Sequence, residues 1–104
     1  IVAPTVGIAA PTIEECNRGY VESDGRKISL QDVKGSLGTL CTIPFNVTGL
    51  PALSLCCGFS SSGLPIGMQI VAAPFQEGTV FRVAHAYERA AKWYERKPPL
   101  PQGV

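Results

Sequence analysis

Apolar side chains recur at helical spacing near the end of the chain. Within Glu77–Trp93 they fall three or four positions apart, and charged side chains fill most of the other positions. This pattern predicts an amphipathic helix that packs Val80, Ala84 and Tyr87 against the rest of the protein. Residues 95–104 follow it as a proline-rich tail, which is typical of the stop after a final helix.

Two apolar runs in the middle of the chain predict a β-hairpin. They cover Ala52–Phe59 and Leu64–Ala72, and the serine-rich stretch Ser60–Gly63 between them has the length of a hairpin turn. Both faces of these strands are largely apolar, so we expect helices or further strands to cover them on both sides. The pattern also predicts the end of another strand at residues 1–3.

A surface loop and a kinked helix are expected before the hairpin. Residues 16–34 are polar and interrupted by glycine, which predicts a surface loop with at most one short helical turn. Ser36 is a candidate N-cap for a helix that passes through Leu40, bends at Pro44 and ends at Gly49.

Length, charge and composition narrow the class of protein. A chain of 104 residues forms one domain at most, and its net charge of +1 includes no basic cluster of the kind that binds nucleic acid. No apolar run approaches the roughly 20 residues of a membrane span, and no signal peptide is present, so we expect a cytoplasmic protein without a membrane partner. The start at Ile1, without Met, favours a fragment over a natural short protein.

The cysteines and the single histidine predict no metal site. Cys16, Cys41, Cys56 and Cys57 form no C-x-x-C pair, and His85 stands alone on the predicted helix. A zinc site needs about four convergent ligands at characteristic spacings. We therefore expect reduced thiols, no metal and no cofactor.

Serines 60–62 are the most prominent candidate nucleophiles, but a serine nucleophile needs a base within hydrogen-bond reach. The sequence identifies no such partner, so the turn interpretation is favoured. His85 has no carboxylate or nucleophile tied to it, and a role as general base is not favoured. Asn46 begins a glycosylation sequon, yet without a signal peptide we expect its amide to bond the backbone near Pro44.

An ordered set of motifs between Thr42 and Gln69 extends over both predicted strands. The pattern T-x-P-x-N-x-x-G-x-P-A-x-S is carried by Thr42, Pro44, Asn46, Gly49, Pro51, Ala52 and Ser54. It continues in Gly58-Phe59, Gly63-Leu64-Pro65, Gly67 and Gln69, then in Pro74-Phe75 and Arg82-Val83-Ala84. With the opening Ile1–Thr5, this set resembles the C-terminal segment of the amidase signature family of serine amide hydrolases. Cys56 departs from the pattern, because the family usually has proline there.

The resemblance implies an α/β fold, in which this chain is one segment, residues 1–104, of a large mixed β-sheet with flanking helices. It also implies hydrolysis of carbon–nitrogen amide bonds by a serine nucleophile, a second serine in a cis peptide and a lysine base. None of these three maps onto this sequence, so no catalytic residue is assigned and the chain is expected to be inactive alone. By analogy, Ser36, Thr39 and Ile43 are predicted to line the acyl side of the substrate pocket.

Two hypotheses remain open. In the first, the chain is the C-terminal part of an amidase related to the amidase-type component of glutamyl-tRNA amidotransferases, and its partners are a small-molecule amide and a missing N-terminal portion. In the second, it is a non-catalytic interaction or oligomerisation domain derived from an amidase, for instance a homodimer. The sequence does not choose between a general amidase and a component of a tRNA amidotransferase.

Overall fold

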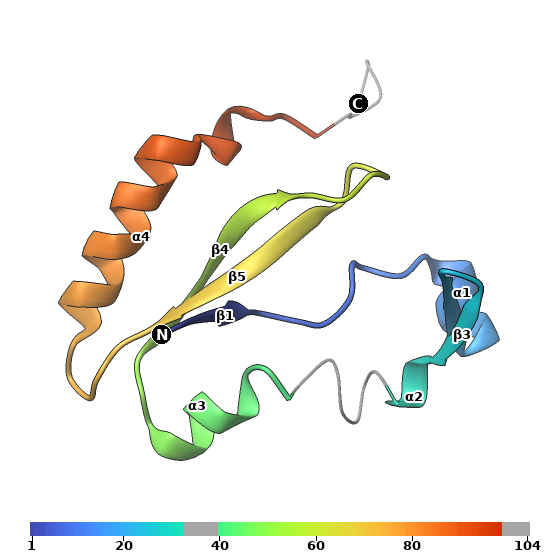
Figure 1. Cartoon of the computed structure of the whole chain (residues 1–104), viewed down its shortest axis with the longest axis horizontal. Helices are drawn as coiled ribbons and strands as arrows, with labels where there is room; N and C mark the ends of the chain where they lie inside the picture. The colour runs from blue at the N-terminus through green and yellow to red at the C-terminus, as the bar shows by residue number, and fades with distance from the viewer. Residues whose placement is uncertain (33–39, 99–104) are drawn as a thin grey trace.

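The computed structural model describes residues 1–32 and 40–98 of the chain. Its centre is a three-stranded antiparallel sheet, with helix α4 lying along it and a separate two-stranded hairpin to one side (Figure 1). In spatial order the strands of the sheet are β1 (Val2–Pro4), β5 (Pro65–Val71) and β4 (Ala52–Phe59). The sheet therefore brings the N-terminus beside the central hairpin, although more than sixty residues of sequence separate β1 from β5.

The predicted hairpin is confirmed, with bounds that differ by a residue at the second strand. Leu53 lies opposite Ile70, and the register shifts at a bulge between Cys56 and Gly58. The turn is closed by an N–H of Gly63 that donates to the Ser60 carbonyl at 2.9 Å. Gly63 has a φ of +82°, a conformation that glycine adopts without steric penalty.

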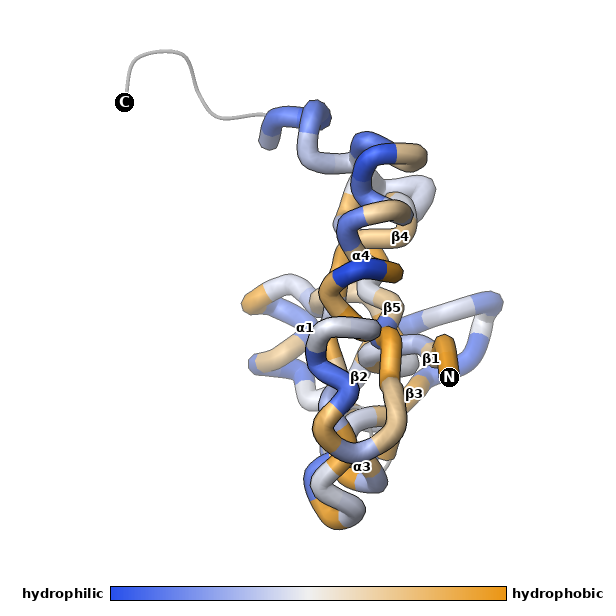
Figure 2. The backbone as a smooth tube through the Cα atoms, turned by 90° about the vertical axis from the view of Figure 1, so that its left-hand side faces the viewer, coloured by the Kyte–Doolittle hydropathy of each residue, from blue (hydrophilic) through white to orange (hydrophobic). Residues whose placement is uncertain are grey.

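Helix α4 (Glu77–Ala91) packs the predicted stripe onto the hairpin. Val80 and Ala84 are buried against Leu55 and Ile70, and Tyr87 is half-buried beside them. The helix mixes polar and apolar residues, whereas the strands beneath it are mainly apolar (Figure 2). It ends slightly sooner than predicted because Lys92 turns to a φ of +54°, and a 3-10 turn, η2 (Trp93–Glu95), follows.

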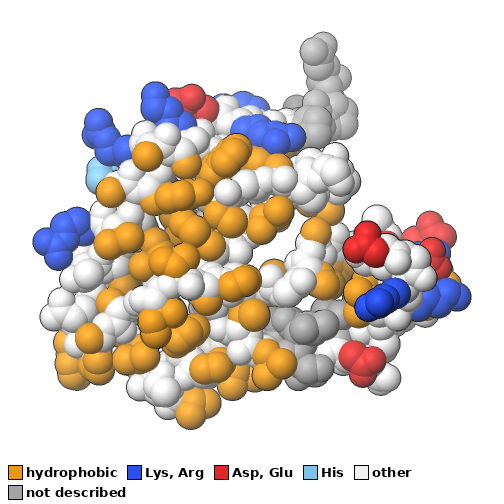
Figure 3. All heavy atoms as spheres, in the orientation of Figure 1, with side chains coloured by type: hydrophobic (Ala, Val, Ile, Leu, Met, Phe, Trp, Pro, Cys, Tyr) orange, Lys and Arg blue, Asp and Glu red, His pale blue; other side chains and the backbone are white. Residues whose placement is uncertain are grey.

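Many apolar side chains of this unit remain at the surface. Figure 3 shows them gathered over the sheet and the adjoining side of α4, with charged groups at the periphery and over the separate hairpin. Val2 is 65% exposed, Ile66 43% and Phe81 63%. We expected cover on both faces of the strands, and within residues 1–32 and 40–98 the one long helix against them is α4. None of the helices in this described part is long and apolar enough to cross a membrane.

The expected surface loop at 16–34 is wrong. The structure has helix α1 (Ile13–Arg18), strands β2 (Tyr20–Ser23) and β3 (Arg26–Ser29), and a short helix α2 (Leu30–Asp32). Local chemistry explains the difference. Thr12 and Glu15 form a reciprocal capping box at the start of α1. Asp24 and Gly25 both have positive φ, as a two-residue hairpin turn requires.

The predicted kinked helix is also corrected. Helix α3 spans only Ile43–Thr48, and Leu40 lies in the turn that precedes it. Pro44 therefore sits in the first turn, where a missing N–H leaves no helical hydrogen bond unmade, and it bends nothing. Gly49 ends the helix with a φ of +67°, as predicted. The proposed cap Ser36 lies outside the described residues.

Candidate functional site

The residues of the Thr42–Gln69 motif converge on one groove beside the sheet. The groove has a volume of about 180 Å³ and lies between the end of β1, the start of α3 and the first half of β4. Its lining is Thr5, Thr42, Phe45, Asn46, Ala52, Leu53, Ser54 and Gln69. Segments far apart in the sequence thus meet here, and we call this cavity the motif groove.

Gln69 holds the groove together. It is the one buried polar side chain among the described residues, at 3% exposure, and it stands on the central strand β5. Its Nε2 donates to the Pro4 carbonyl at 2.8 Å and to the Cys41 carbonyl at 2.5 Å. One amide group therefore ties the end of β1 to the turn that leads into α3.

Two hydroxyl groups form the wall of the groove next to Gln69. The Oγ1 of Thr5 and the Oγ of Ser54 lie 2.7 Å apart, and either can donate. Gly67 allows this contact, because a Cβ at that position would lie 3.1 Å from Thr5 Oγ1 and 3.4 Å from Ser54 Oγ. The glycine in the G-x-Q part of the motif is thus a packing requirement of the groove.

Asn46 and Thr48 exchange the roles expected of them. The hydroxyl of Thr48, and not the Asn46 amide, donates to the Pro44 carbonyl, at 2.7 Å. Asn46 instead lines the motif groove and is exposed to solvent there. Its position makes it available to a ligand.

The three predicted substrate-binding residues are only partly placed. Ser36 and Thr39 lie outside the described residues. Ile43 opens α3 and is 46% exposed, next to the groove residue Thr42 but not itself in the lining. Sequence reasoning did not assign Thr5 and Gln69 to a site, although a glutamine inside the apolar run Leu64–Ala72 is a signal of a buried polar contact.

The groove's chemistry is that of binding. Its polar side chains are hydroxyls and amides, which donate and accept hydrogen bonds but do not ionise near neutral pH. Among the described residues, no three of His, Cys, Asp or Glu lie where they could hold a metal ion. The arrangement therefore fits recognition of a neutral polar group such as an amide.

The serines at 60–62 form the hairpin turn that the sequence predicts. Ser60 Oγ accepts from the Leu64 N–H at 3.1 Å and lies 2.8 Å from Ser62 Oγ. His85 is exposed on α4, at a shallow cavity with Glu88 and the cations Arg89 and Lys92. Neither place joins a nucleophile to a base.

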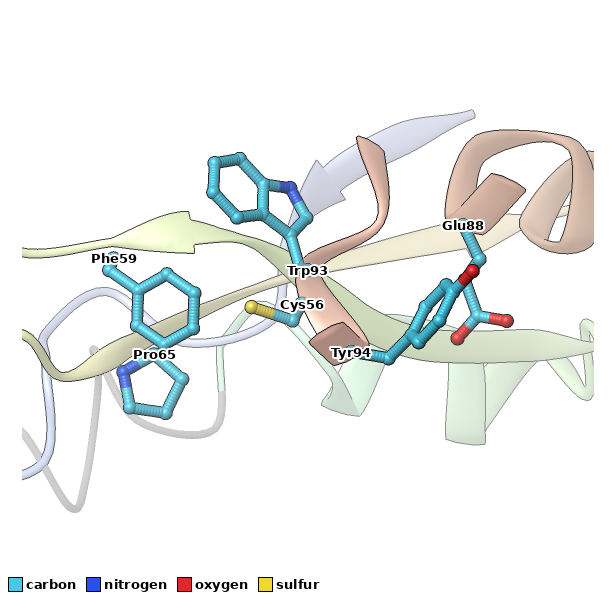
Figure 4. Close-up of a pocket in the computed structure, with 6 residues that line it drawn as sticks. All are labelled: Cys56, Phe59, Pro65, Glu88, Trp93 and Tyr94. Atoms are coloured by element: carbon cyan, nitrogen blue, oxygen red, sulfur yellow. The ribbon is translucent and has the colours of Figure 1, made fainter. Parts of the chain in front are cut away.

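A second cavity lies where η2 meets the hairpin (Figure 4). It measures about 210 Å³, and its lining is Cys56, Phe59, Pro65, Glu88, Trp93 and Tyr94. Aromatic contacts close its rim. The rings of Phe59 and Trp93 meet edge to face at 5.7 Å, and the Arg96 guanidinium lies 3.9 Å from the Phe59 centroid. These contacts fasten the end of the described chain to the hairpin.

Cys56, which departs from the motif, lies in β4 directly before the bulge. It is paired with Gly67 across the hairpin, and its Sγ donates to the Gly58 carbonyl at 3.3 Å. The strand thus continues through the position where the family usually has proline, and the local irregularity falls after it.

Comparison with known proteins locates this unit within a family. The model of the Amidase family matches residues 1–81. The amidase-type component of the glutamyl-tRNA(Gln) amidotransferase of Brevibacillus brevis is 58% identical over 71 residues, which are 68% of this chain and 14% of that protein. Its counterpart in Gloeothece citriformis is 54% identical over 66 residues, 64% of this chain and 14% of that protein.

Solved structures agree with the sequence relatives. The structure of 6-aminohexanoate cyclic dimer hydrolase complexed with substrate matches with a TM-score of 0.71 and 42% identity, over 94% of this chain and 20% of that one. The chain thus spans a fifth or less of the length of these relatives. Because the family model covers most of the sequence and the fold agrees, this chain belongs to the amidase family.

Proposed function

We propose that this chain is the C-terminal part of an enzyme that hydrolyses a carbon–nitrogen amide bond in a small-molecule substrate. One observation carries the proposal: the residues of the amidase pattern, far apart in the sequence, converge on the motif groove. Thr42, Asn46 and Ser54 contribute polar side chains to it, and Gln69 fixes its geometry. Such a groove suits the positioning of an amide.

The chemical step belongs to residues outside this chain. In the proposed mechanism a serine attacks the amide carbonyl, the C–N bond breaks as the amine leaves with a proton, and water then hydrolyses the acyl-serine ester. A second serine in a cis peptide and a lysine base assist that step. What the described residues supply is hydrogen-bonding groups and apolar walls, so their part is to bind and orient.

Ser36, Thr39 and Ile43 are proposed to line the acyl side of the substrate. Ile43 supports this by its exposure at the first turn of α3, one residue from the motif groove. In a complete enzyme, Ile43→Trp should therefore lower kcat/KM by about tenfold or more for a bulky acyl group, and less for a small one. An unchanged preference between the two substrates would remove Ile43 from the pocket.

The test of the proposed function uses the hydrolase that shares this fold. The chain is co-expressed with that enzyme lacking the matched fifth, and hydrolysis of the 6-aminohexanoate cyclic dimer is measured together with labelling by a fluorophosphonate probe. We expect neither signal from the chain alone, and both from the mixture, with the label on the larger piece. Labelling of the chain alone that disappears in Ser60→Ala, Ser61→Ala or Ser62→Ala would contradict the proposal.

A non-catalytic interaction or oligomerisation domain is the second candidate. The exposed apolar side chains around the sheet, such as Val2 and Phe81, favour it. The same mixing experiment separates the two functions, because an interaction domain would restore no hydrolysis.

A further inference from the structure

Strand β4 forms one outer edge of the sheet, and its backbone is open along that edge. The Ala72 N–H donates to the Pro51 carbonyl at 3.2 Å, which sets the phase of the ladder with β5. Hydrogen-bonded and non-hydrogen-bonded pairs alternate along an antiparallel ladder. The N–H and C=O groups of Ala52, Ser54 and Cys56 therefore point away from β5, toward the open side.

The open edge lies at the side of a groove shared with α4. The groove has a volume of about 480 Å³ and is lined by four successive residues of β4, Leu53 to Cys56, and by a stripe of α4. Successive residues of a strand point to opposite faces, so a groove that touches all four must run along the strand's edge. The stripe consists of Phe81, Ala84, His85 and Glu88.

Nothing in this edge discourages pairing. Natural edge strands are usually protected by charged residues, by proline or by a bulge. Residues 52–56 contain none of these, and the bulge comes only after Cys56. The opposite edge, β1, is different, because it covers three residues and ends at Pro4.

We propose that the Ala52–Cys56 edge of β4 receives a β-strand from the part of the amidase that this chain does not contain. The proposal rests on the proposed function. In the solved relative the matched segment is 20% of the chain, so most of the enzyme lies outside it and is available to supply a strand. The incoming strand extends the ladder of β4, and its α4-facing side chains meet Phe81, which selects an uncharged strand with apolar residues on that face.

Amide hydrogen exchange tests the pairing directly. In the chain alone, the Ser54 and Cys56 amides should exchange fast, while Leu53 and Leu55, which bond to β5, are protected. After co-expression with the hydrolase piece that lacks the matched fifth, exchange at Ser54 and Cys56 should slow by about tenfold or more. If the complex forms and hydrolyses the cyclic dimer while both amides stay fast, the pairing is wrong and the proposed function stands.

A matched pair of variants tests the wall of the groove. Phe81→Lys places a charge beside the incoming strand and should weaken the complex by about tenfold or more. Phe75→Lys makes the same change at a residue that is 91% exposed and outside the groove, and it should leave the affinity unchanged. Equal effects of the two variants, or none from Phe81→Lys, would overturn the proposed docking.

Two further outcomes would also overturn it. The first is protection of Ser54 and Cys56 by a second copy of the chain that the hydrolase piece does not displace. The second applies if the separate pieces do not assemble. The chain is then joined covalently in place of the matched segment, and fast exchange at both amides in that folded chimera would exclude the pairing.

Discussion

At the scale of single residues, Gln69 has the largest structural consequence relative to its size. Replacing it by leucine keeps the volume but leaves the Pro4 and Cys41 carbonyls without their donor. We expect Gln69→Leu to lower the free energy of unfolding by about 1–3 kcal/mol in urea denaturation. Gln31→Leu, at an exposed position of α2, is the control and should change little. Equal stability of the two variants would mean that Gln69 does not hold the groove.

Gly49 and Gly78 provide a second test at this scale, because a Cβ would contact nothing within 4 Å at either position. They differ in backbone conformation: Gly49 has a φ of +67°, and Gly78 lies inside α4. Gly49→Ala should therefore cost about 1–2 kcal/mol, whereas Gly78→Ala should stabilise by about 0.5 kcal/mol. Thermal or urea melts of both variants measure the difference, and the same sign for both would contradict the assigned helix end.

At the scale of elements, the packing of α4 on the hairpin is the main stabilising contact. Tyr87 contacts the core cluster, and its hydroxyl donates to the Cys57 carbonyl at 3.4 Å and accepts from Trp93 Nε1 at 3.1 Å. Tyr87→Ala should lower the free energy of unfolding by about 2–4 kcal/mol. Phe75→Ala removes an aromatic ring that is 91% exposed and should cost less than about 0.5 kcal/mol. A loss at Tyr87 as small as that at Phe75 would show that α4 is not held there.

The capping box of α1 gives an element-scale prediction for pH. The hydrogen bonds from the Thr12 backbone N–H and side chain hold the pKa of Glu15 below its ordinary value of 4.5. A carboxyl whose pKa is lowered by folding stabilises the fold above its unfolded pKa, and that contribution disappears as pH falls through the folded pKa. NMR titration should show the midpoint of Glu15 below 4.5, and Thr12→Ala should raise it. An unchanged midpoint in Thr12→Ala would exclude the capping bond as the cause.

The elements also show what sequence reasoning can reach. The β4–β5 hairpin and α4 were predictable, because apolar periodicity over a long stretch reports burial. The β2–β3 hairpin was missed although Asp24-Gly25 signals its turn, because polar strands carry no such periodicity. Helix α3 was made too long, since Pro44 was taken for a kink when it marks a helix start. Of the motif groove, the sequence indicates the members, but only the fold shows that Gln69 brings them together.

At the scale of the whole molecule, the surface resembles part of a larger protein. Apolar side chains at Val2, Ile66 and Phe81 are exposed, and the uncharged edge of β4 is unpaired in the part of the chain that the structure describes. Exposed apolar surface of this kind favours association. The chain alone should therefore self-associate as its concentration rises, and more strongly in sulfate, which strengthens apolar burial. Light scattering measures the mass.

The complementary piece of the hydrolase should reverse this association, because it competes for the same apolar surface and the same strand edge. Addition of that piece should replace the concentration-dependent species by one complex of fixed mass, and Phe81→Lys should weaken both the self-association and the complex. Phe75→Lys is again the matched control, since Phe75 lies in the loop before α4 and does not line the β4 groove. A monodisperse monomer of the chain alone at high concentration would contradict the prediction, and would mean that the exposed apolar residues do not form an adhesive surface.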